Sequence, residues 1–267
     1  MIDKDFIDNL RIKWQTTEIN VLREYVQHLF LANLYKQREA EGLFFKGGTA
    51  LRVAYQSPRF SEDLDFSSAI RSASKIEDLI QETLLEMDKG GIKLTIAEAK
   101  KTSGGYLFDS KTNLFGHDIE IKLNFVIKNN LDGDSIVVRS VFIPPYNITV
   151  LKQESLIGEK IQAFLTRGKT RDWFDLYFII RANLGGKALS EDYEKAIKKV
   201  EKTKINFSEL KTFLPHSFWP VVADLRKNLL KILIKTRRFL KPKIILFSML
   251  KNLKRCLKIS QKANYLM

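Results

Sequence analysis

The sequence predicts an α+β fold, in which a mixed sheet with flanking helices is followed by a bundle of helices. Three observations predict it. Short runs of alternating polar and apolar residues, which are typical of strands, occur between residues 43 and 143. From residue 150 onward, apolar residues instead recur at three- and four-residue steps, which is typical of helices. Pro144 and Pro145 separate the two regions and mark a boundary.

The first region begins with helices and continues with strands. Apolar side chains recur at helical spacing through residues 4–40, with no Pro or Gly before Gly42. A further helix is expected at residues 50–55 and another at 74–87, where Ser74 is the expected N-cap. The expected strands cover residues 43–45, 63–66, 92–98, 105–109, 118–127 and 135–143.

The second region has helical periodicity. Its expected helices cover residues 153–168, 171–184, 190–203 and 217–235. We therefore expect an α/β domain at residues 1–147, a helical domain at residues 148–235 that completes a cleft with it, and a tail at residues 236–267. The pattern of the tail fits either a basic amphipathic helix or a poorly ordered extension.

The composition is that of an ordinary globular protein, with 45% hydrophobic and 28% charged residues. Cys256 is the only cysteine, which excludes a disulfide framework and a cysteine-ligated zinc site. The N-terminal residues lack the apolar segment of a signal peptide, and no apolar run reaches the ~18–20 residues needed to cross a bilayer. We therefore expect a cytoplasmic protein without a membrane span.

The net charge of +14 is concentrated at the C-terminal end. Residues 231–267 contain eleven Lys or Arg and no acidic residue, which leaves 34 basic and 31 acidic residues in residues 1–230. A basic segment can bind nucleic-acid phosphates in a salt-dependent way, and it can equally be a solvated extension. The near balance of charge in the rest of the chain is unlike a typical RNA-binding surface.

Two short motifs carry the candidate chemistry. The segment Lys46–Thr49 (Lys-Gly-Gly-Thr) follows an expected strand and opens an expected helix. Glycines at a helix N-terminus leave backbone N–H groups free for a phosphate, and the helix dipole favours its negative charge. Asp63 and Asp65 lie on the next expected strand, where residues two apart point to the same face. Two carboxylates that close repel one another unless a cation such as Mg²⁺ lies between them.

Neither motif is specific alone, because most Gly-Gly pairs are only turns and most Asp-x-Asp strands are only solvated. Their combination across one short helix is much more specific, since it puts a phosphate site beside a metal site. Nucleotidyl transfer requires both sites. The glycine segment is not a Walker loop, because no Gly-Lys-Ser/Thr ends the turn.

Two pairs of segments resemble the AbiEii/AbiGii toxin family. Phe45–Arg52 and Arg59–Phe66 resemble the first motif of that family. Leu156–Phe164 and Arg167–Tyr177 resemble its Glu-Lys helix and its Arg-Asp-x-x-Asp-Leu-Tyr segment. The resemblance covers roughly residues 20–230. It implies a nucleotidyltransferase fold of the DNA polymerase β type, followed by helices.

The resemblance also implies roles for individual residues. Mg²⁺ or Mn²⁺ would be bound by Asp63 and Asp65. The triphosphate of an NTP would be bound by Lys46, Gly47, Gly48, Thr49, Lys160 and Arg171. The catalytic residues would be Asp63, Asp65, Lys160 and Asp175. On chemistry alone, the favoured interpretation of Lys160, Arg171 and Asp175 is an ion-pair network between helices.

A third metal-binding carboxylate is missing from the position where the resemblance leads us to expect it. That position on the 118–127 strand holds Asn124, whose amide oxygen can bind a metal but cannot act as a base. Glu120 lies on the same face of that strand and is the candidate third metal ligand, although an exposed polar edge explains it equally well. The identity of the general base is therefore left open.

The implied function is metal-dependent transfer of a nucleotide from an NTP to an acceptor, with RNA, and tRNA in particular, as the first candidate. The resemblance further implies the toxin of a toxin–antitoxin or phage-defence pair, and so an antitoxin partner. Two alternatives stay open. In the first, the acceptor is a small molecule or a protein hydroxyl. In the second, the chain is an inactive relative that binds a nucleotide.

Overall fold

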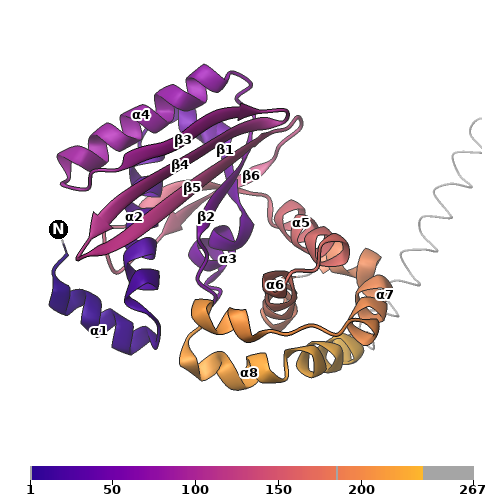
Figure 1. The fold of residues 1–267 in the computed structure, drawn as a ribbon. Helices are drawn as coiled ribbons and strands as arrows, with labels where there is room; N and C mark the ends of the chain where they lie inside the picture. Colours follow the sequence, from indigo (N-terminus) through magenta and orange to yellow (C-terminus); the bar gives the residue numbers. More distant parts are fainter. Residues whose placement is uncertain (1, 185, 237–267) are drawn as a thin grey trace, which may run out of the picture.

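The computed structural model describes residues 2–184 and 186–236, and its centre is a seven-stranded sheet in the order β3-β4-β5-β2-β1-β7-β6 (Figure 1). The strands are β1 (Leu43–Lys46), β2 (Asp63–Ser68), β3 (Thr95–Thr102), β4 (Gly105–Leu114), β5 (His117–Ile127), β6 (Gly133–Val138) and β7 (Tyr146–Leu151). β2 is antiparallel to β1 and parallel to β5, and β1 is parallel to β7. The sheet is therefore mixed, as the sequence predicts.

Helices flank this sheet and follow it. They are α1 (Lys4–Trp14), α2 (Glu18–Leu34), η1 (Arg38–Gly42), α3 (Gly47–Tyr55), α4 (Ala73–Lys89), α5 (Gln153–Thr166), α6 (Thr170–Arg181), α7 (Gly186–Lys202), η2 (Ser208–Phe213), η3 (His216–Phe218) and α8 (Trp219–Ala223). A further helical run covers residues 225–236. α2 packs on both α4 and β5, whereas α5 contacts α6, α7 and β7. Figure 1 shows the helices from α5 onward gathered to one side of the sheet, so the predicted fold class is confirmed.

The core explains why β2 presents its aspartates where it does. Leu64 and Phe66 of β2 are fully buried, and the Phe66 ring lies between Phe45 of β1 and Phe125 of β5, with centroids 5.3 and 4.9 Å away. Burying one such side chain stabilises the fold by roughly 1.5–3 kcal/mol. Because alternate residues of a strand point to opposite faces, this packing fixes which face the residues between them occupy. A slip by one residue would bury two carboxylates.

The first helical region is divided more than its periodicity indicates. Within residues 4–40, Gln15 ends α1 in the left-handed region with φ 52°, and the side chain of Thr17 caps α2. Apolar spacing continues across this break because both helices pack on the same core. The predicted N-cap of α4 is also wrong, since the side chain of Ser72, not Ser74, accepts the capping hydrogen bond.

The sheet extends past the predicted boundary at residue 147. β7 (Tyr146–Leu151) follows Pro144-Pro145 directly and pairs with β1 in the middle of the sheet. Its residues form only a short segment directly before a strong helical pattern, so no separate strand was predicted there. Of the expected tail, residues 237–267 lie outside the described residues. In the part of the chain that the structure describes, no helix is long and apolar enough to span a membrane.

Candidate active site

Asp63 and Asp65 lie on the same face of β2, opposite its buried core side. In the sheet register, Asp63 is level with Lys122 of β5. Asp65 is level with Asn124 of β5 on one side and with Lys46 of β1 on the other. The strand alternation thus brings both carboxylates to the end of β1, where the glycine turn begins.

The glycine turn forms the first turn of α3, directly beside these carboxylates. Gly47 has φ +85°, in the left-handed region, and a Cβ there would lie 2.3 Å from Oδ2 of Asp65. A Cβ on Gly48 would lie 2.4 Å from Nη2 of Arg59 and 2.7 Å from Oγ of Ser61. The absence of side chains at both glycines therefore lets Asp65 approach the turn from one side and Arg59 from the other.

The side chain of Thr49 secures the backbone next to the site. It is buried, and its hydroxyl donates a 2.5 Å hydrogen bond to the carbonyl oxygen of Asp63. Nearby, the side-chain amide of Gln27 on α2 donates bonds of 2.9 Å to the carbonyl oxygens of Ser61 and Glu62. The hydroxyl of Thr49 is thus used within the protein, so only its backbone N–H would be available to a phosphate at this turn.

Lys46, the last residue of β1, is buried and held by a carboxylate of α5. Its Nζ lies 3.0 Å from Oε2 of Glu159, and Lys128 pairs with the other oxygen of the same carboxylate. Burial opposes ionisation of Glu159, but the charges of Lys128 and Lys46 outweigh it and hold the pKa of Glu159 below its ordinary value. Glu159 therefore ties the helical region to the end of the strand that carries the glycine turn.

Asp175 of α6 is buried and joins three separate parts of the chain. Its Oδ1 accepts a 2.8 Å hydrogen bond from Nε of Arg59, and its Oδ2 accepts from Nη2 of Arg59 at 3.1 Å and from Nζ of Lys160 at 2.8 Å. Burial alone would raise the pKa of Asp175, but Arg59 and Lys160 hold it well below its ordinary value. The carboxylate is 1% exposed, so it faces these two cations and not open solvent.

Arg171, on the same helix, stands apart from that network and extends toward the aspartates. Its Nη1 lies 3.9 Å from Oδ2 of Asp63. Burial and the charge of Asp65 raise the pKa of Asp63, and Arg171 partly opposes the rise. The alternative interpretation was an ion-pair network of Lys160, Arg171 and Asp175. The structure contains the pair of Lys160 with Asp175, but the other cation bound to Asp175 is Arg59 and not Arg171.

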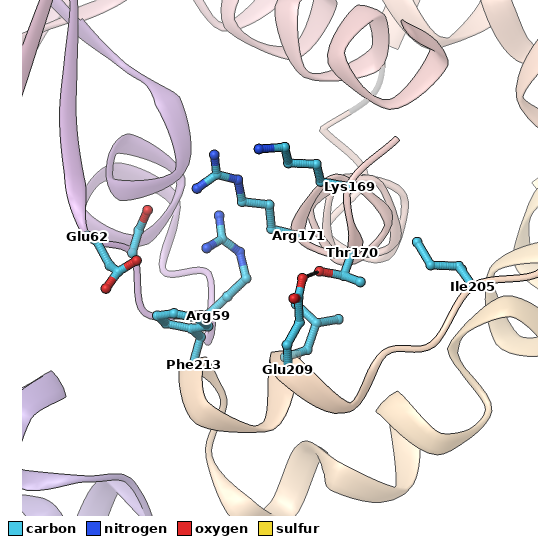
Figure 2. Close-up of a pocket in the computed structure, with 10 residues that line it drawn as sticks. Arg59, Glu62, Lys169, Thr170, Arg171, Ile205, Glu209 and Phe213 are labelled. Atoms are coloured by element: carbon cyan, nitrogen blue, oxygen red, sulfur yellow. Dashed lines mark hydrogen bonds between the residues drawn. The ribbon is translucent and has the colours of Figure 1, made fainter. Parts of the chain in front are cut away.

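A cavity of about 500 Å³ lies between the segment before β2 and the start of α6. It is lined by Arg59, Ser61, Glu62, Lys169, Thr170, Arg171, Ile205, Glu209, Leu210 and Phe213. Figure 2 shows the charged ends of Lys169 and Arg171 pointing across it toward the segment that carries Arg59 and Glu62. Its volume is typical of small-molecule sites, and its cationic groups beside an apolar wall suit a nucleotide.

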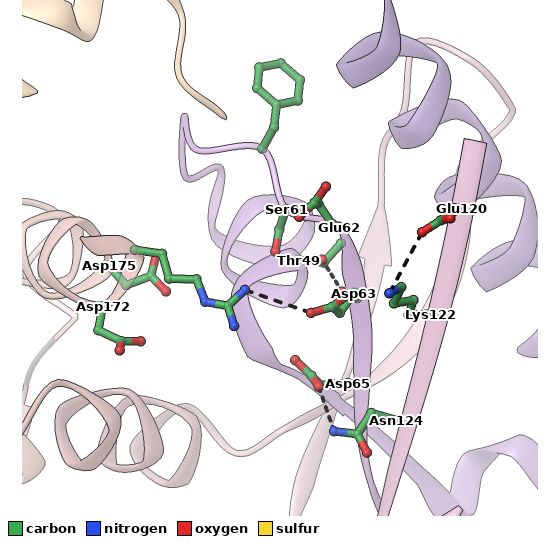
Figure 3. Close-up of polar contacts among 12 residues, drawn as sticks. Thr49, Ser61, Glu62, Asp63, Asp65, Glu120, Lys122, Asn124, Asp172 and Asp175 are labelled. Atoms are coloured by element: carbon green, nitrogen blue, oxygen red, sulfur yellow. Dashed lines mark hydrogen bonds and ion pairs between the residues drawn. The ribbon is translucent and has the colours of Figure 1, made fainter. Parts of the chain in front are cut away.

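Glu120 does not join the aspartates. Its carboxylate lies 2.8 Å from Nζ of Lys111 and 3.8 Å from Nζ of Lys122, and Figure 3 shows it directed along β5 away from Asp65. Among the described residues, no group of three or more His, Cys, Asp or Glu could hold a metal ion. The structure therefore pairs Glu120 with Lys111 of β4 and Lys122 of β5 and not with a cation at the aspartate pair.

Asn124 lies where that third ligand was first expected. Its Nδ2 donates a 3.3 Å hydrogen bond to Oδ1 of Asp65 (Figure 3). The two carboxylates are hard oxygen donors, which is the kind of ligand that Mg²⁺ and Mn²⁺ take, whereas Asn124 turns its Nδ2 toward them. The raised pKa of Asp63 reflects burial and a repulsion that a cation would relieve. The residues present therefore fit a divalent metal ion.

The sequence matches a known family over most of its length. Residues 29–240 match the family described as nucleotidyl transferase AbiEii toxin, of type IV toxin–antitoxin systems. The chain belongs to the AbiEii family. The resemblance seen in the motifs is thus confirmed, and the glycine turn and both aspartates fall within the matched range. No curated protein matches the chain.

Two solved structures share the fold of this AbiEii-family protein. JHP933 from Helicobacter pylori has a TM-score of 0.57 at 20% identity, over 88% of this chain and 99% of that chain. A second H. pylori structure, described as that of a candidate nucleotidyltransferase, has a TM-score of 0.56 at 19% identity, over 85% and 98%. Identities this low show a common fold.

Several residues that shape the site of this AbiEii-family protein have partners far away in the sequence. Arg59 binds Asp175, which lies 116 residues later, and Glu159 binds Lys46, 113 residues earlier. Nothing in the sequence around Gln27 predicts its hydrogen bonds to the carbonyl oxygens of Ser61 and Glu62. Arg59 and Asp175 do lie in the two motifs of the resemblance, and that is the one signal that could have paired them.

Proposed function

We propose that this protein transfers a nucleotide from an NTP to RNA, with tRNA as the acceptor and Mg²⁺ or Mn²⁺ as the cofactor. It would act as the toxin of a phage-defence pair with an antitoxin. One observation carries the proposal, namely the close approach of Asp65 to the glycine turn. A Cβ added to Gly47 would lie only 2.3 Å from Oδ2 of Asp65. A phosphate at the glycine turn and a metal at the aspartates would therefore be neighbours.

The triphosphate would lie at the first turn of α3. Gly47 and Gly48 leave its backbone N–H groups uncovered, and the helix dipole favours negative charge there. Lys46 from β1 and Arg171 from α6 supply positive charge, and Lys160 adds a third cation from α5. The base would then enter the 500 Å³ cavity that Arg171 lines.

Asp63 and Asp65 would hold the metal, and Asn124 would add its amide oxygen once its side-chain amide turned over, since Nδ2 faces Asp65 in the structure. When bound, the cation offsets the charge repulsion between the phosphates and the attacking oxygen. In the transfer, the 3′ oxygen of the acceptor forms a bond to the α-phosphorus while the bond from that phosphorus to the pyrophosphate oxygen breaks. The electron pair leaves with pyrophosphate, and the hydroxyl proton passes to water.

The network of Arg59, Asp175 and Lys160 would keep these groups in place. Asp175 fixes the ammonium of Lys160 and the guanidinium of Arg59, whose Nη2 borders the glycine turn. A displacement of about 1 Å can lower a transfer rate roughly 100-fold, because orientation supplies much of the acceleration. The two residues would thus have different roles. Lys160 would contact phosphate, and Asp175 would act by positioning Lys160.

A small-molecule or protein hydroxyl is a second candidate acceptor. The charge balance of residues 1–230 favours this candidate. These residues include 34 basic and 31 acidic ones, which is a smaller excess of positive charge than an RNA-binding surface usually has. The same metal and triphosphate sites would serve that reaction, so the distinction depends on the acceptor alone.

The test is incubation of the full chain with Mg²⁺, total tRNA and each α-³²P-labelled NTP in turn. We expect one NTP to label tRNA with the wild-type protein, and the Asp63→Ala/Asp65→Ala variant to give no label. Wild-type protein that releases pyrophosphate without labelling tRNA would favour the small-molecule or protein acceptor. No pyrophosphate release with any NTP would contradict the proposed activity.

A further inference from the structure

A second, much smaller cavity borders Asp63. Its volume is about 110 Å³, and it is lined by Arg23, Glu62, Asp63, Glu120 and Lys122. Since a water molecule occupies about 30 Å³ in the liquid, this space corresponds to roughly three or four waters. It is too small for a nucleotide, and it has room for one sugar ring or one phosphate group.

The position of this cavity in the sheet is informative. β2 lies between β1, which leads into the glycine turn, and β5, which carries Glu120 and Lys122. Asp63 therefore lies between the triphosphate site and the cavity. Figure 3 shows Lys122 and Glu120 on one side of Asp63 and α6, with Asp172 and Asp175, on the other. Because attacking and leaving oxygens lie roughly in line at phosphorus, a hydroxyl held in this cavity would approach from the side of Asp63 opposite the glycine turn, which suits displacement of pyrophosphate.

The lining of the cavity alternates hydrogen-bond donors and acceptors. Nη2 of Arg23 lies 3.2 Å from Oε1 of Glu62, and Nζ of Lys122 lies 3.8 Å from Oε2 of Glu120. Nε of Arg23 is buried and has no hydrogen-bond partner, so this guanidinium has more donors than its neighbours use. Sugar hydroxyls need both donors and acceptors, and a guanidinium with an ammonium suits a phosphate.

We propose that this cavity receives the 3′-terminal sugar of a nucleic-acid acceptor, with Arg23 and Lys122 binding the adjoining phosphate. The inference rests on the proposed transfer reaction and specifies its acceptor side. The attacking 3′ hydroxyl then lies next to Asp63, opposite the leaving pyrophosphate. An acceptor without a phosphate keeps only hydroxyl contacts and lacks the charged contact with these two cations, so the cavity would favour a nucleic-acid end over a protein or small-molecule hydroxyl.

The variants Arg23→Ala and Lys122→Met test this with the full chain, total tRNA and the NTP that the wild-type protein uses. We expect each to raise the KM for tRNA at least about tenfold at an unchanged KM for the NTP, as for the loss of one hydrogen bond to a charged group. The dependence of tRNA affinity on salt should also become shallower, by about one phosphate contact for each variant. Lys100→Met is the matched control, because Lys100 is a strand lysine paired with Glu98 at 54% side-chain exposure against 50% for Lys122.

The outcomes separate this inference from the proposed function. Wild-type labelling of tRNA together with unchanged tRNA KM and salt dependence in both variants would overturn the cavity and leave the transfer reaction standing. A wild-type protein that labels no nucleic acid would overturn both. If Arg23→Ala lowers the melting temperature, the half-exposed Lys122→Met decides alone.

Discussion

Asp175→Asn removes one charge from a buried ion network while keeping the size of the side chain. The carboxylate is 1% exposed and accepts hydrogen bonds of 2.8 and 3.1 Å from Arg59 and of 2.8 Å from Lys160. Arg59 itself is 4% exposed, so the variant leaves a buried guanidinium without a counter-charge. Breaking a buried pair in this way costs about 3–5 kcal/mol in the free energy of unfolding.

The assay is thermal unfolding followed across pH. In a domain of this size, a loss of 3–5 kcal/mol lowers the melting temperature by roughly 10 °C. The pKa of Asp175 is lowered in the folded state, so its contribution is full above the unfolded-state pKa of about 3.9 and is lost as the pH falls through the folded-state value. The difference between wild type and variant should therefore be constant between about pH 5 and pH 8 and narrow only below about pH 4.

Two comparisons make this prediction specific. Asp8→Asn removes a carboxylate that is 40% exposed and paired with Arg11, and it should cost under about 1 kcal/mol. Combining Asp175→Asn with Arg59→Met should cost less than the sum of the two single changes, because no unpaired guanidinium then remains. A loss for Asp175→Asn as small as that for Asp8→Asn would refute the reasoning.

The remaining predictions concern the turn, its support and the metal. Gly47→Ala should lower the transfer rate at least about 100-fold, because its Cβ would displace the carboxylate of Asp65. Gly158→Ala is the control and should leave the rate unchanged, because its Cβ would meet open space. Equal rates for the two variants in single-turnover assays would count against this. Thr49→Val should cost about 0.5–1.5 kcal/mol in urea unfolding, since it removes the part-buried hydrogen bond to the carbonyl of Asp63; an unchanged midpoint would contradict it. Chelation by EDTA should abolish label transfer and added Mg²⁺ or Mn²⁺ should restore it, while full activity in EDTA would argue against a divalent metal.

The sheet and the placement of the motifs could be predicted because they depend on local patterns. Alternation in β2 fixes which residues enter the core, and that alone puts Asp63 and Asp65 on the opposite face. The glycine turn is likewise visible in the sequence. Its tight approach to Asp65 is not, because that distance depends on how β1 and β2 pair.

The missed features depend on tertiary pairing. β7 was missed because its few residues differ little from the loop and helix around them, and only its pairing with β1 defines it. Glu120 and Asn124 share one face of β5, and the sequence could not decide between them. In the structure Glu120 pairs with Lys111 of β4, whereas Asn124 bonds to Asp65, and both contacts depend on how the strands pair.

The measurement that tests the central claim most directly is single-turnover transfer by Asp63→Asn beside Asp88→Asn. Both changes remove one carboxylate, but Asp63 would hold the metal, while Asp88 is exposed on α4. With the wild-type protein, Mg²⁺, labelled NTP and tRNA as reference, we predict loss of both labelled tRNA and pyrophosphate for Asp63→Asn and wild-type rates for Asp88→Asn. Transfer by Asp63→Asn at the wild-type rate would contradict the claim that β2 carries the reaction centre.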